Sequence, residues 1–151
     1  MSIRRYCRLS LLLGIVLTAL AVAGGHADDW VDRLNSADEQ TRASALGEAM
    51  GRGASAIAPL GELAASADPA TSLRALRAME RIVHSGSGPA TPVQRRAASL
   101  AVCRLLWIDA PVPVKAAEVR LIGYVGDDEA VAALARLLNH SGLGEDVRQA
   151  L

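Results

Sequence analysis

The apolar residues of this chain recur at helical spacing, and no segment shows the strict alternation of apolar and polar residues that indicates a half-buried strand. The clearest example is residues 126–140, GDDEAVAALARLLNH, whose apolar positions 131, 134, 137 and 138 share one side of a helix. Acidic residues or prolines open such segments and glycines follow them, as is typical of helix starts and stops. The pattern predicts first helices over 38–50, 68–84 and 113–125, and second helices over 54–65, 92–107 and 127–139.

The predicted helix pairs also repeat in sequence. Ser36-Ala37-Asp38 returns thirty residues later as Ser66-Ala67-Asp68, and at the same offset positions 43, 45, 46 and 49 match positions 73, 75, 76 and 79. Positions 57, 60 and 63 match positions 131, 134 and 137 at an offset of seventy-four. This shared packing scheme predicts an all-α fold, a short α-solenoid of antiparallel helix pairs. About three pairs are expected, with partial units over 30–34 and 145–151 at the two ends.

Three segments resemble HEAT-type repeats, in particular the short bilin-lyase-like class: DEQTRASALGEAMG, VPVKAAEVRLIGYVGDDEAVAALARLLN and EDVRQAL. That class carries a basic residue early in its first helix and a Gly-x-x-Gly-Asp turn. The matching residues are Arg42, Lys115 and Arg148 at the basic position, and Gly123, Gly126 and Asp127 in the turn. Ser72 departs from the pattern at the basic position of the second unit, and HSGSGPATP lengthens the loop of that unit. The resemblance implies a HEAT-like superhelix over residues 28–151 that serves as a protein-interaction scaffold.

The N-terminal segment has the layout of a secretory signal. Arg4, Arg5 and Arg8 precede an apolar run over 9–23, and Gly25-His26-Ala27 then supplies small residues before Asp28. We expect residues 1–27 to be a signal peptide cut between Ala27 and Asp28, with a cut after Ala23 as the second choice. The protein is then secreted or periplasmic. An uncleaved segment that anchors the protein to a membrane is the alternative.

The composition of the chain limits the kinds of partner that it can bind and the interactions that can stabilise it. Without Arg4, Arg5 and Arg8, thirteen of the sixteen basic residues remain against sixteen acidic ones, and this balance argues against binding to nucleic acid or an anionic membrane. Cys103 is then the one remaining cysteine, so no intramolecular disulfide can form. Only 3% of residues are aromatic, which suits close-packed helices better than a β-sandwich.

The residues that could carry chemistry all favour a structural interpretation. Asp127-Asp128-Glu129 suggests a helix cap rather than a metal cluster, because three adjacent acids at a helix start point in different directions. Cys103 has no histidine or aspartate placed to activate it, and His84 and His140 each follow a helix as a cap would. HSGSGP lacks the lysine and preceding strand of a phosphate loop. We expect no catalytic, metal or cofactor site.

One predicted helix carries apolar residues on the side where a polar, solvent-facing surface would be expected. On the predicted helix 92–107, Arg95, Ser99, Val102 and Leu106 lie opposite the arc formed by Val93, Ala97, Leu100, Ala101, Leu105 and Ile108. If that arc is core, the four residues form a partner-binding stripe with Arg95 at its rim. The alternative is a central helix wedged between neighbours and apolar nearly all round.

The C-terminal end is expected to be an unsealed face. Residues 146–151 are too few for a stable isolated helix, so part of Leu134, Leu137 and Leu138 should be exposed. Such an end would lead to end-to-end self-association through this repeat or to docking against a partner, or would mark a gene product cut short. Leu46, Leu76 and Leu134 are expected in the core.

These observations favour a non-enzymatic, HEAT-type scaffold that binds a protein outside the cytoplasm. Two alternatives stay open. One is an accessory factor for chromophore or cofactor attachment, suggested by the repeat class, and the other is a piece of a larger HEAT-repeat protein.

Overall fold

The computed structural model describes residues 29–87 and 91–151, and within these ranges the chain is helical and contains no strand. The elements are α2 (Asp29–Leu34), α3 (Glu39–Arg52), the 3-10 helix η1 (Gly53–Ala56), α4 (Ile57–Ala64), α5 (Pro69–Ser87), α6 (Pro92–Leu105), α7 (Val112–Val125), α8 (Asp128–Ala135) and α9 (Gly144–Ala150). The all-α prediction is confirmed for these residues. The predicted signal peptide and residues 88–90 of the HSGSGPATP loop lie outside them.

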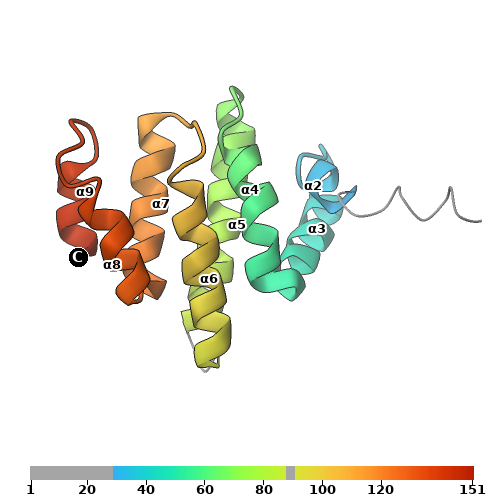
Figure 1. Ribbon diagram of the computed structural model, residues 1–151. Coiled ribbons are helices and arrows are strands. Elements are labelled where there is room, and N and C mark those ends of the chain that lie inside the picture. The colour runs from blue at the N-terminus through green and yellow to red at the C-terminus, as the bar shows by residue number, and fades with distance from the viewer. Residues whose placement is uncertain (1–28, 88–90) are drawn as a thin grey trace, which may run out of the picture.

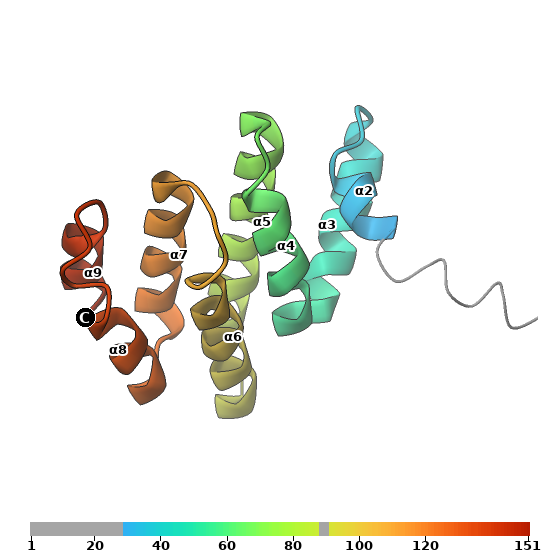
Figure 2. The same ribbon diagram turned by 45° about the horizontal axis from the view of Figure 1, so that its top comes forward.

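The helices stand side by side in one row, with α2 and α3 at one end and α9 at the other (Figure 1). The turned view shows the same row (Figure 2). Contacts divide the row into two layers: α3, α5, α7 and α9 touch in succession, and α2, α4, α6 and α8 do the same. Consecutive helices cross between the layers, as α4 does to α5 and α6 to α7. Each layer therefore presents one long face of the molecule.

Two of the helix starts are built alike, thirty residues apart. The backbone N–H of Thr41 donates to the Asp38 carboxylate at 2.7 Å, and the backbone N–H of Thr71 donates to Asp68 at 3.0 Å. Both threonine hydroxyls donate to the same carboxylates at 2.6 Å. These bonds satisfy helix N–H groups that have no partner within the helix. The repeated Ser-Ala-Asp therefore marks an equivalent cap in the two units.

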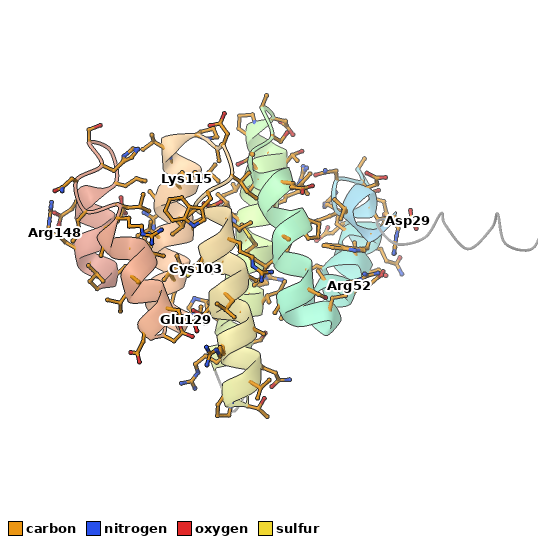
Figure 3. The ribbon with its side chains drawn as sticks, viewed as in Figure 1. Asp29, Arg52, Cys103, Lys115, Glu129 and Arg148 are labelled. Atoms are coloured by element: carbon orange, nitrogen blue, oxygen red, sulfur yellow. The ribbon has the colours of Figure 1, made fainter. Side chains whose placement is uncertain are left out.

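The residue at the basic position of a unit binds backbone carbonyls at the end of the preceding helix or in the turn that follows it. Arg42 donates to the carbonyls of Ser36 and Ala37, at 2.7 Å in each case. Lys115 Nζ donates to the carbonyl oxygens of Leu105 and Leu106 at 2.9 and 2.7 Å. Figure 3 shows Lys115 at the end of α7 that meets the end of α6. Carbonyls at a helix C-terminus lack partners within the helix, so these bonds join successive units.

Ser72 performs the same task with a shorter side chain. Its hydroxyl donates to the carbonyl of Ala64, the last residue of α4, at 2.7 Å. The departure from the basic pattern therefore changes the donor and keeps the contact. Arg148 differs, because its guanidinium pairs with Glu145 of its own helix at 2.7 Å.

Burial repeats with the same offset as the caps. Ala45 and Ala49 are fully buried in α3, and their counterparts Ala75 and Met79 are fully buried in α5. Leu46 and Leu76 are only partly buried at the edge of the core, so the expectation that both lie in the core was wrong. Their place at the edge leaves apolar surface open to solvent.

The C-terminal end of the row is more closed than the sequence suggested. Helix α9 forms and packs mainly on α7, where Ala150 Cα lies 3.4 Å from the position of a Cβ on Gly123. Leu143 and Val147 are buried there, and Leu134 is 2% exposed. The expectation that Leu134 would be partly exposed was therefore wrong. Leu137 and Leu138 stay partly exposed, as does Val131 at 52%.

The turn between α7 and α8 uses both Gly126 and Asp127, two of the residues that match the HEAT-type turn. Gly126 ends α7, and its backbone N–H donates to the Ile122 carbonyl. A Cβ at Gly126 would lie 2.7 Å from that same oxygen, so the close approach requires glycine. Asp127 then caps α8 by accepting from the backbone N–H of Ala130 at 3.2 Å.

Among the described helices, none combines the length and apolar character needed to span a bilayer.

Candidate protein-binding face

The layer formed by α3, α5, α7 and α9 carries three grooves, each lying between neighbouring helices. We name them by these helices: the α3–α5 groove, the α5–α7 groove and the α7–α9 groove. Arg77 of α5 lines the first two, and Arg120 and Tyr124 of α7 line the last two. The three grooves therefore follow one another along a single face.

The α3–α5 groove has a volume of about 430 Å³ and is strongly basic. Its lining residues are Leu34, Glu39, Arg42, Ala43, Leu46, Arg74, Arg77, Ala78 and Arg81. Leu34 and Ala78 are buried and form its floor. Four arginines therefore surround an apolar floor with one glutamate among them. Arginine guanidinium groups recognise carboxylates and phosphates through paired N–H donors.

The α5–α7 groove is more apolar and has an aromatic wall. Leu73 is 47% exposed and Tyr124 is 57% exposed, and both line it. The ring of His84 on α5 lies 4.5 Å from the ring of Tyr124, measured between centroids. Exposed tyrosine beside arginine is a combination common at protein interfaces.

The stripe predicted on α6 is mostly inside the molecule. Ser99, Val102 and Leu106 are buried, whereas Arg95 is exposed, as is Val93 from the arc that we assigned to the core. The proposed orientation of this helix was therefore wrong. Helix α6 contacts α4, α7 and α8, so it is covered on more than one side. This is the wedged central helix of the alternative interpretation.

The acidic start of α8 serves as a cap and as a contact between helices. Ser99 Oγ donates to Asp127 at 3.3 Å, and Arg96 forms an ion pair with Glu129. Asp128 and Glu129 are exposed. Within the residues that the structure describes, no three histidine, cysteine or acidic side chains lie close enough together to hold a metal ion.

Cys103 lies on α6 beside this acidic start, as Figure 3 shows with Glu129. Burial raises the pKa of its thiol, and the negative charges of Asp127 and Glu129 raise it further, against a lowering by a hydrogen bond with Ser99. A raised pKa disfavours the thiolate that a nucleophile requires.

His140 makes a turn contact. Its Nδ1 accepts a hydrogen bond from the backbone N–H of Gly142 at 3.2 Å.

Glu118 of α7 is a polar side chain that the sequence did not single out. It is 1% exposed, and its Oε2 has no hydrogen-bond partner among the described residues. Burial raises its pKa to about 7, and the charge of Lys115 lowers it in part. It faces the core rather than the three grooves, so it bears on stability and not on the candidate site.

The arginines of α5 were also missed, although their spacing is visible in the sequence. Arg74, Arg77 and Arg81 follow one another by three and four residues, which places them on one side of a helix. A line of charges on a helix usually means only a solvated face. The neighbouring helix α3 turns this line into one wall of a groove.

No protein-family model matches the chain, and neither the curated proteins nor the solved structures include one similar to it.

Proposed function

We propose that the protein is a non-enzymatic, HEAT-type scaffold, a short α-solenoid that binds another protein outside the cytoplasm. Three features support the solenoid arrangement. The caps at Asp38 and Asp68 are equivalent, burial recurs thirty residues apart, and residues at the basic position link successive units. Helices that contact only their neighbours in two layers are the arrangement expected of such repeats.

One observation carries the binding function. The successive grooves on the layer of α3, α5, α7 and α9 combine arginines with partly exposed leucines and a tyrosine. Isolated exposed apolar residues are ordinary, but apolar side chains gathered along one face and rimmed by polar groups mark interaction surfaces. In the opposite layer, three of the four residues of the stripe predicted on α6 are buried.

The place of action rests on the N-terminal sequence. The arginines, the apolar run and the Gly-His-Ala before Asp28 support export followed by cleavage. N-terminal sequencing of the protein recovered outside the cytoplasm should find a start at Asp28. A cytoplasmic protein that retains Met1 would contradict export.

Photo-crosslinking from defined positions tests the binding face. A photoreactive benzoyl-phenylalanine is placed at Leu73 on α5, or at Val131 on α8 as the matched control, since the two side chains are 47% and 52% exposed. In the cell that makes the protein, we expect illumination to yield a discrete crosslinked protein from Leu73 and none from Val131. Equal crosslinking from both positions, or from neither, would overturn the assignment of the face.

A further inference from the structure

The arginines of the α3–α5 groove differ in the hydrogen bonds and ion pairs that their guanidinium groups already form. Arg42 donates from one guanidinium nitrogen, Nη1, to the carbonyls of Ser36 and Ala37. Arg74 reaches Asn35 Oδ1 at 3.4 Å, which is long for a hydrogen bond. Among the described residues, Arg77 and Arg81 have neither an ion pair nor a side-chain hydrogen bond. Two exposed arginines that line the groove therefore have guanidinium donors that no described side chain uses.

Helix stability alone does not account for this cluster. Arg77 is three residues from Arg74 and four from Arg81, and like charges at these spacings repel one another on a helix. Glu80 directly precedes Arg81. It lines the α5–α7 groove, as Arg77 also does, but it does not line the α3–α5 groove. A negatively charged occupant of the α3–α5 groove would relieve the repulsion.

The charge of the groove also contrasts with that of the chain around it. From Asp28 onward, acidic residues outnumber basic ones by sixteen to thirteen, whereas the groove has four arginines and one glutamate. Such a local excess steers oppositely charged partners toward it. The surrounding negative charge disfavours a long polyanion such as nucleic acid, because only a short stretch could avoid repulsion.

Apolar surface in the same groove specifies the occupant further. Leu46 is partly exposed beside the buried floor of Leu34 and Ala78. A free phosphate or a purely acidic polymer would leave this surface in water. A protein segment can place an apolar side chain there and carboxylates on either side.

We propose that the α3–α5 groove binds an acidic segment of a partner protein, whose carboxylates pair with Arg77 and Arg81 while one of its apolar side chains packs on Leu46. This deepens the proposed function and rests on it. Paired guanidinium–carboxylate contacts give the complex its orientation, and the apolar contact excludes water around them.

Binding of a defined peptide tests the proposal. The probe is a short, fluorescently labelled peptide of glutamates and leucines, compared with the same peptide carrying lysine in place of glutamate. We expect the purified protein to bind the acidic peptide preferentially, with an affinity that falls as salt is added. The double variant Arg77→Glu/Arg81→Glu should weaken this binding by roughly tenfold or more. The double variant Arg104→Glu/Arg136→Glu is the matched control and should leave binding unchanged. It makes the same change of charge at two exposed arginines of the other layer, one on α6 and one at the end of α8.

Three results would overturn the proposal: equal affinity for the two peptides, equal loss of binding in the control variant, or tighter Arg77-dependent binding of a labelled single-stranded oligonucleotide. Loss of fold is checked by circular dichroism. The milder Arg77→Gln/Arg81→Gln variant removes repulsion, so it should retain full helicity and still bind more weakly. Crosslinking from Leu73 without selective binding of the acidic peptide would reject this proposal and leave the scaffold function standing.

Discussion

Replacing Glu118 with glutamine should make the protein more stable at neutral and alkaline pH, and by an amount that depends on pH. Glu118 is the one charged residue buried among those the structure describes, and Oε2 has no partner there. Burial raises the pKa of this carboxyl from 4.5 to about 7. Glutamine has nearly the same shape but no charge, so the substitution isolates the cost of ionisation.

The sign and size follow from proton linkage. Because the folded state holds the proton of Glu118 more tightly than the unfolded state does, the free energy of unfolding falls as pH rises from about 4.5 through about 7. Above that window the loss should reach roughly 3 kcal/mol, since each pKa unit corresponds to about 1.4 kcal/mol. Glutamine lacks this dependence. The buried amide adds its own desolvation cost, but that cost is the same at every pH.

Urea unfolding followed by circular dichroism, at a series of pH values, measures the effect. The difference in free energy of unfolding between Glu118→Gln and the parent should grow by roughly 3 kcal/mol from about pH 4.5 to about pH 8. Glu62→Gln, at an exposed glutamate of α4, is the control and should show no such growth. A pH-independent difference for Glu118→Gln would refute the assignment of a buried, protonatable carboxyl.

Four further outcomes are expected. Leu134→Ala should lower the free energy of unfolding by about 2–5 kcal/mol, whereas Val131→Ala, at an exposed site of the same helix, should change it little in the same urea assay. Gly126→Ala should destabilise by roughly 1–3 kcal/mol, because its Cβ would meet the backbone oxygen of Ile122; a neutral result would contradict the turn geometry. Asp68→Ala should lower the midpoint of thermal unfolding at neutral pH. The hydrogen bonds from Thr71 hold the pKa of Asp68 below its usual value, so this difference should shrink as pH falls through that pKa. Cys103→Ser should leave peptide binding intact, and lost binding would give the thiol a role that the geometry does not support.

The helices and their order could be predicted from sequence because local signals agree with the packing. Asp38 and Asp68 each precede a threonine by three residues, and both form the caps that this spacing suggests. Gly53 ends α3 with a φ of 55°, a conformation that favours glycine. Signals of this kind act within one turn of helix, so a single sequence contains them in full.

The orientation of α6 could not be predicted for a physical reason. Its residues are apolar on more than one side, so a helical wheel cannot tell which side meets which neighbour. Val93 is exposed while Val102 is fully buried on the same helix, which packs on α4, α7 and α8. Only the positions of the other helices decide between the two sides.

The candidate site was missed for a similar reason. Arg77 and Arg81 form an ordinary charged face until α3 is placed beside them. Glu118 stands three residues after Lys115, a spacing that suggests an exposed ion pair, yet its side chain is buried on α7, a helix that packs on α5, α6 and α9. Both features arise from contacts between helices that are distant in sequence.

The central claim is that a protein partner docks on the arginine-rich face of α3, α5 and α7. The most direct test measures the crosslink from Leu73 in cells that make either the Arg77→Glu/Arg81→Glu variant or the control variant Arg104→Glu/Arg136→Glu, at equal protein levels. Our account predicts that the crosslinked partner is lost with Arg77→Glu/Arg81→Glu and retained with Arg104→Glu/Arg136→Glu. A crosslink of unchanged yield in the Arg77→Glu/Arg81→Glu variant would contradict it.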